Sequence, residues 1–176
     1  NGPYVNSGYF KTEGLDFSAT VNLKLSDNVR FTSRADVTYV RKFNVDFGDG
    51  FVRKYAGTLA PYELSSGAGT PRVRGNWMNS VDVGNFSLAA TTYFVSRIKQ
   101  VAADEEEGGT KMTCAATAGT LYPYPDGNTQ CYIKKFIYAD LHASYKVNDN
   151  FTFYVDVGNF TNEKAPIAPA SYSGIN

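Results

Sequence analysis

The chain has 176 residues, enough for one ordinary domain with a sizeable core. Its 17 basic and 17 acidic residues balance, which excludes the basic excess of a nucleic-acid-binding surface, so no nucleic-acid partner is expected. No apolar run reaches the roughly 18 residues that a transmembrane helix needs, which excludes such a helix. The 13 Tyr, 12 Phe and 16 Gly, against two Met and one Trp, are typical of a protein built from strands.

The first predicted strands are two unusually long segments, Leu15 to Leu25 and Val29 to Val45, separated only by Ser26-Asp27-Asn28. Apolar and polar residues alternate along both, which predicts strands with one apolar and one polar face. Roughly 11 residues at ~3.3 Å each span ~36 Å, and a tilt of ~45° projects this to ~26 Å, close to the thickness of a bilayer's hydrocarbon core. The pattern therefore predicts the wall of a membrane-spanning barrel.

Further strands follow after a Gly-, Ser- and Pro-rich loop from Asp46 to Thr70, which includes a short strand extension near Phe51 to Tyr55. One strand is predicted from Arg72 to Val83 and the next from Phe86 to about Val101, joined by a tight turn at Gly84-Asn85. A second long loop, from Ala102 to Gln130, holds an acidic run.

The last two predicted strands run from Tyr132 to Val147 and from Phe151 to Val157, with a short turn at Asn148-Asp149-Asn150. From Asn162 onward the pattern dissolves into a Pro- and Ser-containing loop. Along the whole chain, short and long connections therefore alternate strictly. This alternation is typical of outer-membrane barrels, which have short periplasmic turns and long extracellular loops.

Aromatic and charged residues agree with a barrel wall. Aromatic residues gather at strand ends, Tyr39, Phe43 and Phe94 near long loops and Phe31, Phe86, Tyr145 and Phe151 near short turns. Two such belts are expected at the two membrane interfaces, whereas a sandwich core would not require aromatics at strand ends. Mixed charges share the polar faces, as suits a wet interior: Arg30, Arg34, Arg72, Arg74, Arg97, Lys99, Asp16, Asp36, Asp82, Asp140 and Asp156.

The two cysteines, Cys114 and Cys131, lie in the second long loop. A disulfide between them would place the protein in an oxidising compartment, and two free thiols are the alternative. The chain has no C-x-x-C motif and no cluster with metal-ligand spacing, so no metal or cofactor is expected.

No catalytic constellation is predicted. The single histidine, His142, has Asp140 and Ser144 two positions away on the same strand face. Such neighbours are roughly 6.5–7 Å apart, too far for the direct hydrogen bonds of a catalytic triad. We therefore expect that the protein is not an enzyme.

Three short motifs resemble the C-terminal barrel region of TonB-dependent outer-membrane receptors. They are Gly14-Leu15-Asp16-Phe17, Gly69-Thr70-Pro71-Arg72 and, most specifically, Val157-Gly158-Asn159-Phe160-Thr161-Asn162 followed by Ala165-Pro166. The resemblance implies an all-β fold in which about six long antiparallel strands belong to a larger transmembrane barrel of about 22 strands. Residues 1–176 would then be a partial barrel domain from the C-terminal region of a longer receptor, without its plug domain and last strand.

The resemblance also implies the partners and the place of the protein. It would lie in the outer membrane of a Gram-negative bacterium, in contact with lipid, with the plug domain of the same receptor and, through the missing N-terminal region, with the TonB complex. It would take up a scarce extracellular small molecule of unknown identity. Tyrosines of the long loops are the candidate ligand contacts, because each combines a flat apolar ring with a hydroxyl group: Tyr55, Tyr62, Tyr122 and Tyr124.

Two alternatives to this function stay open. A passive porin or an adhesin barrel would share the membrane wall but would lack the plug and the energy coupling. A secreted, soluble β-sandwich that binds carbohydrate would use the tyrosines as sugar platforms and would bury the apolar faces between two sheets.

Overall fold

The computed structural model describes residues 8–59, 69–99, 106–107, 110–111 and 132–166. Its main sheet is antiparallel, with strands in the order β1 (Tyr9–Lys24), β2 (Val29–Asp46), β4 (Val73–Val83), β5 (Phe86–Val95), β10 (Phe136–Lys146) and β11 (Thr152–Val157). A two-residue strand, β3 (Arg53–Lys54), pairs with the end of β2. Two further pairs are formed by β6 (Ile98–Lys99) with β9 (Tyr132–Ile133) and by β7 (Glu106–Glu107) with β8 (Thr110–Lys111).

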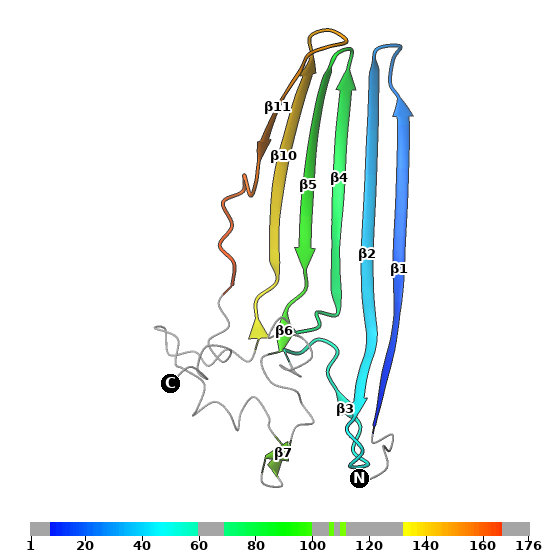
Figure 1. Cartoon of the computed structure of the whole chain (residues 1–176), viewed down its shortest axis with the longest axis vertical. Coiled ribbons are helices and arrows are strands. Elements are labelled where there is room, and N and C mark those ends of the chain that lie inside the picture. The colour runs from blue at the N-terminus through cyan, green and yellow to red at the C-terminus, as the bar shows by residue number, and fades with distance from the viewer. Residues whose placement is uncertain (1–7, 60–68, 100–105, 108–109, 112–131, 167–176) are drawn as a thin grey trace, which may run out of the picture.

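The prediction of an all-β, antiparallel fold is confirmed. Each long strand lies beside the one that precedes it among the long strands, so that the sheet is an up-and-down meander (Figure 1). In the part of the chain that the structure describes, the sheet is open, with β1 and β11 at its two edges. No helix among the described residues is long and apolar enough to cross a membrane.

The strand bounds differ from the predicted ones at the end of the sheet where the long connections lie. Strand β1 begins at Tyr9 instead of Leu15, because its first six residues pair with the far end of β2. The strand predicted to run on from Phe86 ends at Val95 and resumes as β6, and the strand predicted from Tyr132 is interrupted between β9 and β10. The alternation of apolar and polar residues along one strand does not predict these breaks, since they depend on which strand lies alongside.

The three short turns lie together at one end of the sheet, as the alternation of connection lengths predicts (Figure 1). They are also bonded to one another: the backbone N–H of Gly84 donates to the carbonyl of Asn28, and the N–H of Lys146 donates to that of Asn85, each at 2.9 Å. Within the last turn, Asn148 Oδ1 accepts the N–H groups of Asn150 and Phe151 at 2.9 and 3.0 Å. These bonds align the hairpins with one another.

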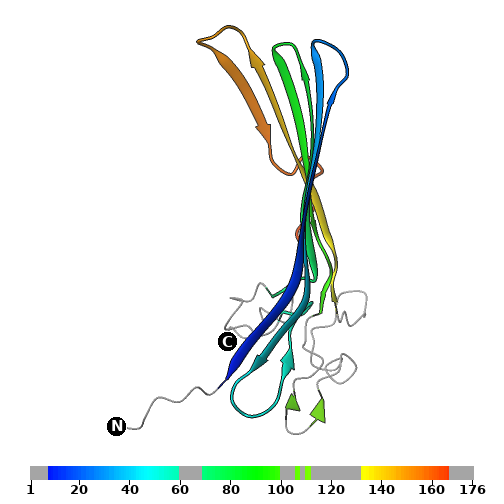
Figure 2. The same ribbon diagram turned by 90° about the vertical axis from the view of Figure 1, so that its right-hand side faces the viewer.

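The pairing register places the apolar side chains of all six long strands on the same face of the sheet. A single row across the sheet illustrates this, each residue lying opposite the next: Leu23, Phe31, Val81, Leu88, Ala143 and Val155. We call this side the apolar face and the opposite side the polar face. Figure 2, which turns the sheet by 90°, shows the long strands as one twisted layer.

The apolar face is open to the surroundings. Phe17, Val21, Leu88 and Val155 are 62, 50, 39 and 63% exposed. These side chains therefore do not interlock beneath a second layer among the described residues, as a sandwich core would require. The described part of the sheet therefore exposes a large hydrophobic surface.

The polar face carries hydrogen bonds between side chains, both within one strand and between neighbouring strands. Ser18 donates to Asp36, and Arg34 Nε donates to the same carboxylate at 2.9 Å. Thr38 Oγ1 donates to Asp16 Oδ1 at 2.7 Å. These bonds satisfy polar groups within the sheet.

A β-bulge changes the faces of β2 near the long connections. The register shifts between Glu13 and Gly14, and Arg41 is the extra residue of β2. Beyond the bulge, Phe43 lies opposite Thr12 and Val45 opposite Phe10, so both are carried to the polar face. The prediction that Phe43 belongs to an aromatic belt at the membrane interface is therefore wrong, because its side chain lies on the polar face.

The same bulge brings Lys42 to the side that carries Lys11 and Glu13. Lys42 lies opposite Glu13, on the side that continues the apolar face, and their charged atoms are 2.9 Å apart. Lys11 Nζ and Arg41 Nη1 also approach Glu13, each at 3.4 Å. The apolar stripe of β1 and β2 therefore ends at Leu15 and Tyr39.

A small hydrophobic cluster lies on the polar side beyond the bulge. Val45 and Tyr55 are 1 and 2% exposed, and the rings of Phe43 and Tyr55 are 6.3 Å apart between centroids. The backbone N–H of Tyr55 donates to the carbonyl of Phe43 at 2.8 Å. This cluster fixes the segment after β3 against the end of β2, and thereby positions the candidate site described next.

Candidate functional site

A hollow of about 630 Å³ lies at the long-connection end of the sheet. The turn after β3, the start of β4, the end of β5 and strand β9 enclose it. Its charged lining is cationic: Lys54, Arg72, Arg97 and Lys99. Because no acidic residue is among the described residues that line it, we call it the basic hollow.

One wall of the basic hollow is the turn from Tyr55 to Leu59, which backbone hydrogen bonds hold in place. The N–H of Lys99 donates to the carbonyl of Gly57 at 2.8 Å, and the N–H of Leu59 donates to that of Lys99 at 2.9 Å. The N–H of Gly57 donates to the carbonyl of Thr70 at 2.6 Å. The turn is thus bonded both to β6 and to the approach to β4.

Arg72 lies beneath this turn. Gly57 has a φ of +82°, and a Cβ at this position would come within 3.0 Å of Arg72 Cγ, so the glycine leaves room for the arginine stem. Arg72 Nη1 donates to the backbone carbonyl of Arg41 at 3.1 Å. The guanidinium is therefore held in place by a neutral acceptor, and its charge is not neutralised there.

Arg97 lies over the ring of Tyr132, with its Cζ 4.6 Å from the ring centroid. A guanidinium at this distance is attracted to the ring's negative face and keeps its charge. In register, Tyr132 lies opposite Lys99, so β6 and β9 bring two cations and an aromatic ring together. Within the described part of the chain, Arg72, Arg97 and Lys99 form no ion pair with a carboxylate.

The register indicates that the basic hollow lies on the polar side of the sheet. Arg72 precedes Arg74 by two residues, and alternation places Arg74 on the polar face, where it lies in register with Thr38. The turn over Arg72 is fixed to Phe43 and Val45, which the bulge has carried to that side. Several unneutralised cations around one concave space attract oxyanions, to which Arg and Lys donate charge-assisted hydrogen bonds.

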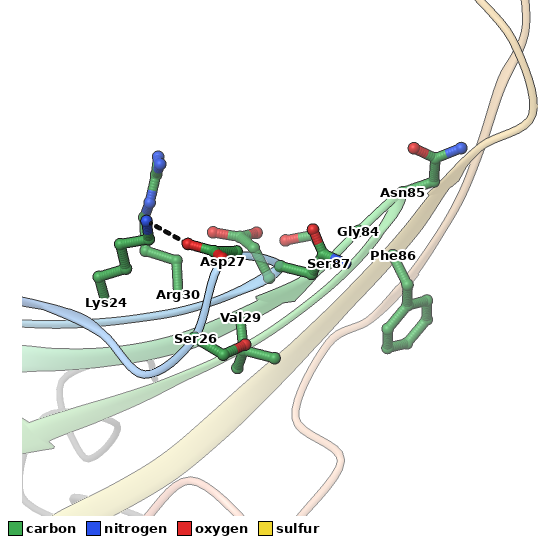
Figure 3. A pocket seen from close by; sticks show the side chains of 11 residues that line it. Lys24, Ser26, Asp27, Val29, Arg30, Gly84, Asn85, Phe86 and Ser87 are labelled. Carbon is green, nitrogen blue, oxygen red and sulfur yellow. Dashed lines mark hydrogen bonds and ion pairs between the residues drawn. The ribbon is translucent and has the colours of Figure 1, made fainter.

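A second hollow, of about 370 Å³, lies at the short-turn end and carries compensated charges (Figure 3). Lys24 Nζ donates to Asp27 Oδ1 at 2.7 Å, and Arg30 lies directly opposite Asp82 in the register. Figure 3 also shows the division of faces, with Phe86 pointing away from Lys24 and Arg30. This hollow has no excess of either charge to hold a ligand.

His142 forms no hydrogen bond with Asp140 or Ser144, the polar residues two positions away on its strand. Its Nδ1 lies 2.6 Å from Oδ1 of Asp156, its cross-strand partner on β11. Asp140 Oδ1 instead accepts the backbone N–H of Asn159 at 2.7 Å. The described residues contain no group of three or more His, Cys, Asp or Glu that could hold a metal ion.

The predicted site residues fall partly outside the described residues. This applies to Tyr62, Tyr122 and Tyr124 and to the predicted disulfide between Cys114 and Cys131. Tyr55 is described, and its side chain is buried in the hydrophobic cluster beside the basic hollow. Its contact with a ligand stays a prediction, while the role visible in the structure is to hold the turn.

The sequence contained a signal for the basic hollow that residue type alone did not reveal. Arg72 begins one predicted strand, and Arg97 and Lys99 lie near the end of the next, so an antiparallel hairpin brings all three to the same end of the sheet. Alternation alone predicts these cations among the mixed charges of the polar face, and residue type alone predicts tyrosines as ligand contacts. The acidic residues of the polar face, however, lie farther along the strands, away from these three cations.

Comparisons with protein-family models, with curated proteins and with solved structures found no match for this chain.

Proposed function

We propose that the chain forms part of the wall of a transmembrane β-barrel in the outer membrane of a Gram-negative bacterium. In this proposal the barrel belongs to a TonB-dependent receptor that takes up a scarce solute. The observation that carries it is the division of the sheet into an exposed apolar face and a hydrogen-bonded polar face. The apolar face would contact lipid, and the polar face would line the lumen.

The height of the apolar face supports lipid as its occupant. At the short-turn end it begins with a row that contains Phe86, Tyr145 and Phe153, and at the other end it stops at Tyr39. The ten residue steps along β2 between these levels, Val29 to Tyr39, span about 34 Å, or about 24 Å at a 45° tilt. This matches the apolar band of about 25 Å on outer-membrane barrels.

The charged residues beyond the band support the same placement. Lys11, Glu13 and Lys42 continue the apolar face past Leu15 and Tyr39, where a lipid-facing side chain would reach the headgroups. Their ion pairs would be costly in hydrocarbon but are stable at a polar interface. An apolar face this wide would be an unusual surface for a soluble monomer.

Uptake driven through TonB rests on the resemblance of the motifs. Two features of the structure suit it: a polar face on which a plug domain could form hydrogen bonds, and a ligand-sized hollow at the long-connection end. The edges β1 and β11 would pair with further strands of the same barrel, since exposed edges invite aggregation.

Spin labels on adjacent residues of β5 test the membrane placement. We expect a label at Leu88→Cys to be accessible to oxygen and protected from a water-soluble nickel relaxant, and a label at Ala89→Cys to show the reverse. Leu88 lies on the apolar face and Ala89 on the polar face, opposite Ser80. Cys114 and Cys131 are replaced by Ser in both variants. Equal access of the nickel reagent to both labels would contradict the proposal.

Planar-bilayer conductance of the complete receptor separates it from a passive porin. A lumen filled by a plug is expected to give no steady conductance in potassium chloride, whereas an open porin conducts steadily. Urea, which unfolds or displaces a plug before the barrel, should then open the pore. Stable conductance without urea would rule out the plugged receptor.

A further inference from the structure

We propose that the basic hollow is a binding site for a multivalent oxyanion, so that the solute recognised by this receptor carries carboxylate or phosphate groups. The location of the site in a receptor rests on the function proposed above. The binding chemistry rests on the hollow itself, which joins Arg72, Arg97 and Lys99 in one concave space.

Three cations of the basic hollow are available for a ligand. Among the described residues, Arg72, Arg97 and Lys99 have no carboxylate partner, whereas Arg34, Arg53 and Lys146 each have one. Three like charges around one space repel one another, and an anion bound between them lowers their electrostatic energy. A single monovalent anion would leave most of this charge uncompensated, which favours a ligand with several anionic groups.

The hollow is shaped before any ligand arrives. Gly57 and Leu59 are bonded to Lys99, and Gly57 to Thr70, so the turn that covers Arg72 is fixed by the backbone. Tyr132 supports the Arg97 guanidinium from one side. Cations held in this way lose less conformational freedom on binding than flexible surface side chains do.

An anion could reach the hollow either as a free solute or as the phosphate of a membrane lipid. The geometry points to the free solute. The hollow lies on the polar side of the sheet, where the turn from Tyr55 packs on Phe43 and Val45. Lipid headgroups would instead meet the opposite side, where Lys42 and Lys11 surround Glu13. A lumen-side hollow faces incoming solutes.

Calorimetric titration of the purified receptor in neutral detergent tests the proposal, with citrate and pyrophosphate as probes and glucose as an uncharged control. We expect saturable binding of at least one anion, which weakens as salt increases, and no binding of glucose. Arg97→Gln and Lys99→Gln should each weaken anion binding on the order of tenfold. Neither side chain forms a hydrogen bond to the backbone among those described, so both variants should keep the fold, which circular dichroism verifies.

Arg30→Gln is the matched control, since it removes the same charge at the short-turn end of the polar face. It should leave anion binding unchanged. Equal weakening by Arg30→Gln would show a diffuse charge effect and overturn the site, as would the absence of any anion binding by the wild-type protein.

A second experiment, with lipids, distinguishes a free solute from a membrane lipid as the source of the anion. The receptor is placed in nanodiscs of phosphatidylcholine alone or with phosphatidylglycerol, and retained anionic lipid is measured in wild type and in Arg97→Gln. Retention that depends on Arg97, without binding of citrate or pyrophosphate, would overturn the free-solute proposal. Failure of the spin-label experiment on β5 would reject the membrane wall but would leave anion binding by the hollow as a separate result.

Discussion

His142 and Asp156 lie directly opposite each other on β10 and β11, with Nδ1 and Oδ1 2.6 Å apart. The ring of His142 also stacks near that of Tyr154, at 6.4 Å between centroids. Strand β11 has only six residues, so few contacts align it with β10. This pair therefore links the last two strands across the polar face, beside the backbone pairing that sets their register.

Removal of this contact should loosen β11. We expect Asp156→Ala to increase hydrogen exchange at the amides of β11 and to cost less than about 1 kcal/mol, because the pair is solvent-exposed. Asp149→Ala is the control, since it removes an ion pair with Lys146 inside the adjoining turn. Exchange that rises equally over the whole sheet in Asp156→Ala would contradict a local role.

A charge on the apolar face should block membrane assembly. Val21→Arg is expected to cost about 2–4 kcal/mol, the usual cost of an arginine facing lipid near the bilayer midplane. Asn22→Arg, one residue along β1, faces the other way and pairs with Thr32, so it should be tolerated. The measurement is the fraction of receptor that reaches the outer membrane in a folded, heat-modifiable form. Similar assembly of both variants would argue against lipid contact.

The turn over Arg72 should depend on Gly57 for two separate reasons. Gly57→Ala adds a side chain at a φ of +82° and crowds the Arg72 stem, whereas Gly50→Ala, at a φ of +80°, has nothing within 4 Å. Both variants incur the left-handed strain of about 1–2 kcal/mol. We expect Gly57→Ala to lower the urea midpoint further and to weaken anion binding, while Gly50→Ala leaves binding unchanged. Equal effects on binding would show that Arg72 is not held by this turn.

The loop after β2 should have an acid-resistant ion pair. Arg53 donates hydrogen bonds to Asp49, and the N–H of Phe51 donates a further one, which lowers the pKa of the Asp49 carboxyl from 3.8 to about 2. Because this pKa is lowered by folding, the stabilisation is fully present above about pH 4 and is lost as the pH falls towards 2.

Carbon-13 NMR of labelled aspartate in detergent micelles measures this pKa. In Arg53→Gln the pKa of Asp49 should return towards 3.8, since its largest cause is removed. Lys54→Gln, the neighbouring charge change, should leave it nearly unchanged. An unaltered Asp49 titration in Arg53→Gln would contradict the pairing.

The predicted disulfide between Cys114 and Cys131 is open to a direct test. We expect neither cysteine of the denatured receptor to react with a maleimide until a reductant is added. Closing a loop of this length contributes on the order of 3 kcal/mol in the chain-entropy model, so reduction should lower stability. Labelling of both thiols without reductant would establish the alternative of free cysteines.

The strands and their two faces follow from the local order of residues. The alternation in Leu15 to Leu25 is a local property, because successive side chains of any strand point to opposite sides. The short turns at Gly84 and at Asn148 follow from equally local chemistry, since the residue types in them favour tight reversal. Connection lengths then ordered the strands into a meander, which the structure confirms.

The arrangement at the long-connection end depends on contacts between segments that are distant in the sequence. The bulge at Arg41 turns Phe43 from the apolar to the polar face, because pairing with β1 accommodates one extra residue there. Tyr55, a plausible ligand contact by residue type, becomes a buried anchor for the same reason. The basic hollow exists because hydrogen bonds join Gly57 and Leu59 to Lys99, about 40 positions away, and no pattern along the chain encodes such long-range bonds.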